Sequence, residues 1–129
     1  MAPSPTCRYN SPMKLTRGRR EFFEGELARA RRARREGRLD EAFACLERAH
    51  VIGQYWIGPH LLSHWEMLRV GLLRLDGREI FGQLLRLALV VPGTWLGRLP
   101  DGNTGGANVN AFRKMPVDPE LARLLAERE

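Results

Sequence analysis

The sequence predicts an all-α protein, and three observations lead to this fold class. Apolar residues recur with helical spacing in four stretches, which glycine and proline separate. No stretch alternates between apolar and polar residues over five positions, as a half-buried strand would. The chain has 129 residues, of which 43% are hydrophobic and 28% charged, so its length and composition suit one globular domain.

The first expected elements are a tail and a pair of helices. Residues 1–16 hold three prolines and are expected to be poorly ordered, whereas residues 17–129 are expected to form a single helical domain. The first helix is predicted from Arg19 to Glu36, because Gly37 is typical of the position after a helix. The second is predicted from Asp40, whose carboxylate favours a helix N-terminus, to Ile52.

Two further helices follow a turn at Gly58-Pro59. The third is predicted from His60 to Leu75 and is closed by Gly77. The fourth is predicted from Glu79 to Val91, because Pro92-Gly93 does not continue a helix.

Short connections make neighbouring helices antiparallel, so these four helices are expected to form two hairpins. The first hairpin has the small-residue spacing of a tetratricopeptide repeat. A solenoid of such repeats needs about three copies, and this chain has one and at most a distorted second. We therefore predict a compact four-helix domain with a tetratricopeptide-like first pair, followed by a short helix that begins near Pro119.

The most apolar stretch runs from Ile80 to Trp95, but Gln83 and Arg86 interrupt it and it is shorter than a membrane span. It is expected to be a buried helix. The two cysteines, Cys7 and Cys45, are too few for a disulfide framework or an all-cysteine metal site. No secretory signal is recognised, so a cytoplasmic location without membrane association is expected.

The net charge of +6 is concentrated near the beginning of the chain, between Arg8 and Arg38. The arginines of helix 19–36 form a basic face, which suits an acidic protein partner. Nucleic acid is a less favoured partner, because no helix-turn-helix, zinc-finger or aromatic-platform pattern accompanies that face.

All three histidines are expected to point inward. At about 100° per residue, His50 lies within the apolar stripe of the second helix. His64 lies within that of the third, with His60 one turn earlier on its flank. The two groups are close in sequence, so the three rings are expected to meet at one end of the domain. Because imidazole is a common ligand for zinc, iron, copper and nickel, we expect one such transition metal ion there.

Two glutamates are candidates for a fourth ligand or for a hydrogen bond to the histidines. Glu47 precedes His50 by one turn, and Glu26 is expected at the same end of the domain. The Glu-x-x-His spacing occurs once, whereas a carboxylate-bridged di-iron bundle uses it twice, so a single ion is expected. Leu61 stands where a metalloprotease would place its glutamate base, so that class of enzyme is excluded.

We expect such a site to serve metal handling or sensing, because no general base can be identified beside an open coordination position of the ion. Water in that position would instead permit catalysis, so enzymatic activity stays open. The alternative function is a tetratricopeptide-like interaction module that binds an acidic partner, in which case the histidines are structural. The glycine-rich loop 102–108 is predicted either as a turn or as a lid or anion-binding nest over one end of the helical bundle.

Several motifs together resemble a family of small bacterial helical proteins. They include Leu46-Glu47-Arg48-Ala49-His50, His60-x-x-x-His64-Trp65 and Gly102-Asn103-Thr104-Gly105-Gly106-Ala107-Asn108. This family is an uncharacterised conserved domain, and the resemblance extends from about Phe22 to Leu125. It implies a bacterial origin and a small stand-alone helical protein, with no established reaction, cofactor or site. It also groups the histidines and the glycine-rich loop in one signature, which suits a shared pocket.

Overall fold

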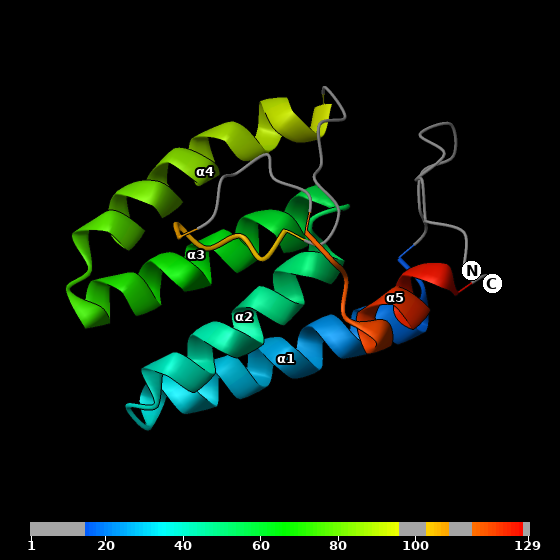
Figure 1. Ribbon diagram of the computed structural model, residues 1–129, viewed down its shortest axis with the longest axis horizontal. Coiled ribbons are helices and arrows are strands. Elements are labelled where there is room, and N and C mark those ends of the chain that lie inside the picture. Colours follow the sequence, from blue (N-terminus) through cyan, green and yellow to red (C-terminus); the bar gives the residue numbers. More distant parts are fainter. Residues whose placement is uncertain (1–14, 96–102, 109–114, 128–129) are drawn as a thin grey trace.

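The computed structural model describes residues 15–95, 103–108 and 115–127. Its only regular elements within these ranges are helices, which confirms the all-α prediction. They are α1 (Arg17–Arg35), α2 (Leu39–Gly53), α3 (Ile57–Arg74), α4 (Gly77–Trp95) and α5 (Pro119–Ala126) (Figure 1). Helices α1 and α2 form one hairpin, α3 and α4 form a second, and α2 packs against α3 between them. Residues 1–14 of the expected tail lie outside the described ranges.

The first hairpin follows the sequence prediction to within two residues at each helix end. The Thr16 hydroxyl accepts a hydrogen bond from the backbone N–H of Arg19 and caps α1. Gly37 has a φ of +77°, a left-handed conformation that glycine adopts without steric cost, and the chain reverses there into α2. Whether this pair is tetratricopeptide-like stays a prediction.

The second hairpin departs from the prediction at its helix ends. α3 begins at Ile57 instead of His60, because Pro59 lies in the first turn, where its missing N–H has no partner within the helix. α3 ends at Arg74, and the next residue, Leu75, takes the left-handed conformation with a φ of 53°, so Gly77 opens α4 and does not close α3. α4 also continues through Pro92, so proline does not terminate it.

The apolar core lies mainly in the first hairpin and its contact with α3. Buried side chains of α1, α2 and α3 pack together there, including Phe23, Leu27, Phe43, Leu46 and Met67. A smaller cluster joins the end of α2 to α5 through Ile52 and Leu121. Burial of these side chains provides the main stabilisation of the fold.

Arg19 fastens α5 to the beginning of α1. Its buried guanidinium donates hydrogen bonds to the carbonyl oxygens of Leu124, Leu125 and Glu127 at 2.8, 3.0 and 2.8 Å. A cation is favoured at this position, because the last carbonyls of a helix carry partial negative charge. The short C-terminal helix is therefore held by a charged clamp as well as by apolar contact.

α4 forms as a helix but is not buried as expected. Among the described helices it contacts α3 alone. Four of its large apolar side chains are exposed: Phe81, Leu84, Leu85 and Leu89. No helix in the described ranges is both long enough and apolar enough to cross a membrane.

Candidate metal centre

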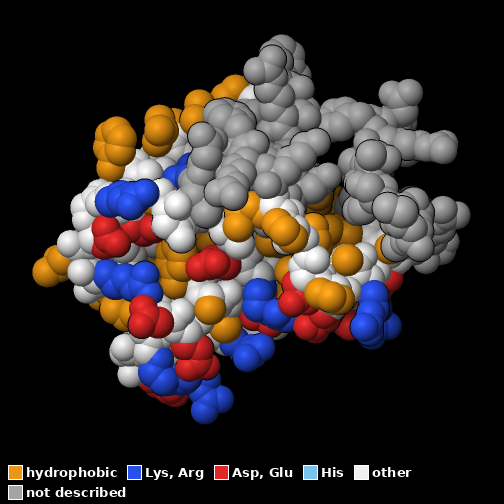
Figure 2. Space-filling model, viewed as in Figure 1, with side chains coloured by type: hydrophobic (Ala, Val, Ile, Leu, Met, Phe, Trp, Pro, Cys, Tyr) orange, Lys and Arg blue, Asp and Glu red, His pale blue; other side chains and the backbone are white. Residues whose placement is uncertain are grey.

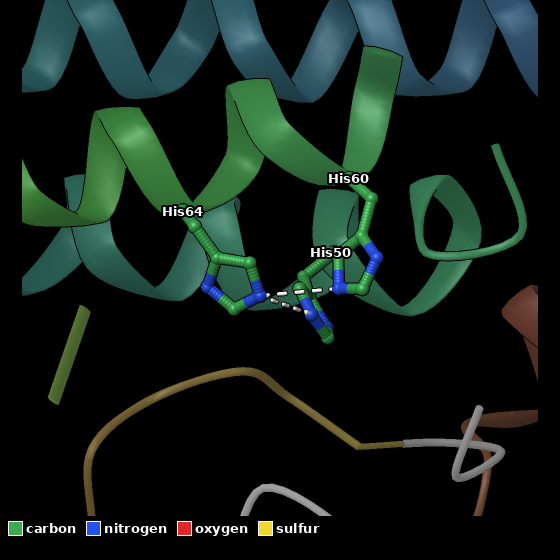
Figure 3. A group of neighbouring side chains, drawn as sticks. All are labelled: His50, His60 and His64. Carbon is green, nitrogen blue, oxygen red and sulfur yellow. Dashed lines mark hydrogen bonds between the residues drawn. The ribbon is translucent and has the colours of Figure 1, made fainter. Parts of the chain in front are cut away.

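The three histidines meet where α2 ends and α3 begins. His50 lies one turn before the end of α2, whereas His60 and His64 occupy successive turns of α3 (Figure 3). Only residues 54–56 separate the two helices, so the end of one adjoins the start of the next. The exposed fractions of the three residues are 3%, 8% and 2%, which confirms that all three point inward.

The Nε2 atoms of the three rings lie close together. The distance from His64 Nε2 to His50 Nε2 is 3.1 Å, and the distance from His64 Nε2 to His60 Nε2 is also 3.1 Å. One ligand nitrogen from each ring lies within 4.8 Å of the other two. Two nitrogens on a tetrahedral ion lie about 3.3 Å apart at the usual metal–nitrogen distance of about 2.0–2.1 Å. The spacing of the rings thus suits one ion bound by three imidazoles.

Carbonyl oxygens determine which nitrogen of His50 and of His64 carries a proton. His50 Nδ1 lies 2.7 Å from the backbone oxygen of Asn103, which can only accept a hydrogen bond. His64 Nδ1 lies 2.7 Å from Oε1 of Gln83. Each ring therefore donates from Nδ1, and in its neutral form each presents an unprotonated Nε2 to the centre.

The orientation of the Gln83 amide is set by its other hydrogen bonds. Its Nε2 donates to Oε1 of Glu79 at 2.6 Å and to the carbonyl oxygen of Gly105 at 2.9 Å. The amide oxygen must therefore face His64. Glu79 is held in turn by the backbone N–H of Ala107 at 3.1 and 3.2 Å. A chain of hydrogen bonds thus runs from the glycine-rich loop through α4 to His64.

If the three rings are neutral and no cation lies between them, some of their buried nitrogens have no suitable hydrogen-bond partner among the described atoms. The lone pairs of His50 Nε2 and His64 Nε2 point at each other across 3.1 Å. His60 can donate a proton to His64 only, and its Nδ1 has no hydrogen-bond partner among the described atoms. Two acceptors that face each other in a buried site are unfavourable. A cation between the three nitrogens removes the conflict, because all three lone pairs then bind it.

Burial keeps the rings neutral. It is the largest cause that lowers the pKa of each histidine: to about 3 for His60, to about 4 for His64, and well below the ordinary value for His50. For His60 and His50, charge on the neighbouring rings lowers the pKa further, and Arg86 does so for His50 and His64. Metal ions bind neutral imidazole, so the site is ready for a metal at neutral pH.

The described part of the glycine-rich loop lies against His50, and whether it acts as a lid stays a prediction. Gly105 has a φ of +83°, and a Cβ placed on it would lie 2.7 Å from the Cγ and Cδ2 atoms of His50. Only glycine permits this approach without displacing the ring. Gly102, the first residue of the predicted loop, lies outside the described residues.

The structure does not bring the two predicted glutamates into the three-histidine group. Glu26 is buried on α1, where its Oε1 accepts from Arg29 and forms an ion pair with Arg48 at 3.5 Å. Glu47 is half-buried, and its pKa is raised first by burial and then by the nearby carboxylate of Glu79. A role for Glu47 or Glu26 as a ligand therefore stays a prediction.

Sequence reasoning missed the groups that hold the histidines. Gln83 gives a signal, because it interrupts an apolar stretch and lies in the motif Gly82-Gln83-Leu84-Leu85-Arg86 that resembles the family, but neither observation predicts a contact with a histidine. Glu79 was expected only as the start of a helix. The backbone oxygen of Asn103 leaves no mark in the sequence, because every residue has one.

Residues 17–125 match the family described as "Protein of unknown function (DUF3703)". The chain therefore belongs to this family, which confirms the expected membership of an uncharacterised family. A bacterial origin stays a prediction. No match was found among curated proteins. None was found among solved structures either.

Proposed function

We propose that this member of the family binds one transition metal ion through the Nε2 atoms of His50, His60 and His64. The observation that carries the proposal is the pair of unprotonated nitrogens on His50 and His64, which face each other at 3.1 Å in a buried site. The Nδ1 hydrogen bonds support it further, because metal-binding histidines commonly donate their other N–H to a carbonyl or carboxylate.

The donor set restricts the ion. Three imidazoles suit zinc, copper, iron or nickel, whereas magnesium and calcium prefer oxygen ligands. Three protein ligands also leave a coordination position for water or for an exchangeable ligand. When bound, the ion would supply a Lewis acid to whatever occupies that position.

Metal handling or sensing fits the surroundings better than catalysis does. Glu79, the carboxylate in the chain of hydrogen bonds, already accepts from Gln83 and Ala107 and so is not placed as a general base. The low exposure of the three rings also suits retention or delivery of an ion. We therefore propose a role in buffering, sensing or transferring the metal.

Elemental analysis of untagged protein, purified without chelator, tests the proposal. We expect about one metal ion per chain in the parent and none after His50, His60 and His64 are all replaced by alanine. The single change His60→Ala should also lower metal content, and it removes the ring with the fewest hydrogen bonds among the described residues. A parent that stays metal-free after incubation with Zn²⁺, Cu²⁺, Ni²⁺ and Fe²⁺ would contradict the proposal.

Two control variants separate the histidines from the predicted glutamates. Glu47→Gln and Glu26→Gln keep the shape of each side chain but remove its charge. If either glutamate is a fourth ligand, its variant should lose metal as His60→Ala does. Unchanged metal content in both variants would restrict the ligand set to the histidines.

The alternative function, a module that binds an acidic partner through α1, receives less support. Five arginines of the predicted basic face pair with carboxylates of this same chain: Arg29, Arg31, Arg32, Arg34 and Arg38. Two of them contact the buried carboxylate of Glu66 on α3. These arginines therefore act within the fold, and the tetratricopeptide-like module remains a second proposal without an observation that favours it.

A further inference from the structure

An ion bound by the three histidines would be enclosed by the protein. These residues are between 2% and 8% exposed. No histidine side chain is visible on the face of the molecule that Figure 2 shows. Transfer of an ion to another molecule therefore requires part of the centre to open. The hydrogen bonds of the three rings indicate which part opens.

The three rings are not held equally. His50 donates from Nδ1 to the backbone oxygen of Asn103 at 2.7 Å. His64 donates from Nδ1 to the amide oxygen of Gln83, also at 2.7 Å. Among the described atoms, Nδ1 of His60 has no hydrogen-bond partner, and its Nε2 contacts only His64. Figure 3 shows the Nδ1 atom of His60 directed away from the other two rings. Two rings are thus fixed from outside the cluster, and one is not.

The missing acceptor weakens the bond that His60 can make to an ion. To bind through Nε2, a neutral His60 must carry its proton on Nδ1. That N–H group is buried, so it loses its hydrogen bond to water and gains none in exchange. Such outer hydrogen bonds typically change metal affinity by about 10–100-fold. The cost falls on His60 alone, because His50 and His64 have their acceptors.

His60 also lies in the part of α3 that opens most easily. It belongs to the first turn of the helix, whereas His64 lies one turn further along (Figure 3). Trp56, the N-cap residue, has no side-chain oxygen to accept from the N–H groups of this turn. Ile57 and Gly58, the first two residues of the helix, are exposed. Because helix ends open at lower cost than helix centres, and glycine weakens a helix further, this turn can open locally.

The supports of His50 and His64 are joined to each other. Gln83 donates to the carbonyl oxygen of Gly105 at 2.9 Å, and the N–H of Gly105 donates to the side chain of Asn103 at 2.9 Å. Displacement of either ring would therefore disturb several connected hydrogen bonds. Displacement of the ring on the first turn of α3 breaks one.

We propose that His60 is the exchange ligand of this centre. The ion stays on His50 and His64 while His60 leaves with the first turn of α3, and a ligand of the recipient molecule takes its place. The bond to His60 breaks with both electrons on the nitrogen, and the recipient donates its own electron pair, so the charge of the ion does not change. An imidazole or thiolate of the recipient suits this step. The inference rests on the proposed function, because it concerns how a bound ion is transferred.

Transfer of Zn²⁺ from the loaded protein to the chromophoric chelator pyridylazoresorcinol, followed by stopped-flow absorbance, tests the inference. Gly58→Ala strengthens the first turn of α3 without touching a ligand, because nothing lies within 4 Å of the added methyl group. We expect this change to slow the transfer by about 2–5-fold. Gly25→Ala makes the same change in α1, again with nothing within 4 Å, and should leave the rate unchanged.

The affinities of two histidine variants supply a second test. His60→Ala should lower the affinity for Zn²⁺ by a factor at least roughly ten times smaller than His64→Ala does, because His60 lacks the outer hydrogen bond. Circular dichroism of the metal-free variants shows whether both are folded. If His64→Ala does not fold, the two glycine variants still decide the question.

A different exit for the ion would lie beneath the glycine-rich loop. Asn103→Ala loosens this loop, because it removes the acceptor of the Gly105 N–H. Faster transfer in this variant, with an unchanged rate in Gly58→Ala, would overturn the exchange role of His60. So would equal losses of affinity in folded His60→Ala and His64→Ala. A parent that takes up no Zn²⁺ gives a different result, since it contradicts the proposed function itself.

Discussion

The two hairpins of this protein distribute polar and apolar side chains in opposite ways. In α1 and α2, Phe23, Leu27 and Leu46 lie inside, and arginines outside pair with carboxylates. In α3 and α4, His64, Gln83 and Glu79 lie inside. The comparison shows that the first hairpin supplies most of the apolar burial, whereas the second supplies most of a polar site, completed by His50 of α2, that could not stabilise a fold by itself.

The largest expected contrast is between a leucine from each hairpin. Leu46→Ala should lower the free energy of unfolding by about 2–5 kcal/mol, because Leu46 is 1% exposed in the core. Leu85→Ala should change it by less than about 0.5 kcal/mol, because Leu85 is 50% exposed. Urea denaturation measures both. If both variants lost the same free energy of unfolding, the proposed difference in apolar burial between the hairpins would be wrong.

Gly105→Ala should damage the histidine site, which lies where the two hairpins meet. The new methyl group would lie 2.7 Å from the ring of His50, at a φ of +83°, so we expect a loss of about 1–3 kcal/mol together with weaker metal binding. Gly25→Ala is the control in the first hairpin, because nothing lies within 4 Å of its added methyl. That change should stabilise the chain by about 0.5–1 kcal/mol. If both variants behaved alike in thermal denaturation, the close approach of Gly105 would be unimportant.

Gln83→Met should lower metal affinity by about 10–100-fold, since it removes the acceptor that orients His64. Competition with a chromophoric chelator measures this. The neighbouring change Leu84→Met, at an exposed position of α4, should leave affinity unaltered. Equal affinity in both variants would mean that the hydrogen bond to Gln83 does not prepare the site.

The smallest effect concerns pH in the metal-free protein. The histidine pKa values are lowered in the folded state, chiefly by burial and further by neighbouring rings and Arg86, while an unfolded histidine has a pKa near 6.5. As pH falls through 6.5, the unfolded state takes up protons that the folded state excludes, so stability is lost. We expect a loss of roughly 1 kcal/mol between about pH 7.5 and 6.5, from three such rings. The triple alanine variant should show no comparable change in urea midpoint over this interval.

Helical periodicity predicted the first hairpin well, because there burial of apolar residues decides the structure. The same reasoning placed His50, His60 and His64 inside from their positions on each helix. The prediction that α4 is buried was wrong, because exposed leucines recur along a helix with the same spacing as buried ones. Periodicity reports that a face is apolar and does not report what covers it.

The remaining errors have local causes. A proline was expected to exclude helix, but Pro59 in the first turn of α3 loses no hydrogen bond. Gly77 was expected to end α3, whereas Leu75 does so at a conformational cost. The supports of the histidines come from residues distant in sequence, and one of them is the backbone oxygen of Asn103. Side-chain patterns therefore identified the histidines and could not identify what orients them.

The Arg19 clamp has a topological consequence. Because it joins α1 to the carbonyls at the end of α5, and Thr16 donates to the Glu127 carboxylate at 3.3 Å, the two ends of the helical domain are neighbours. The helices thus form a nearly closed ring of chain. A circular permutant that links residue 127 to residue 16 and opens at Gly37 should keep the histidine centre intact. Helix packing, not the position of the chain ends, would then specify this fold.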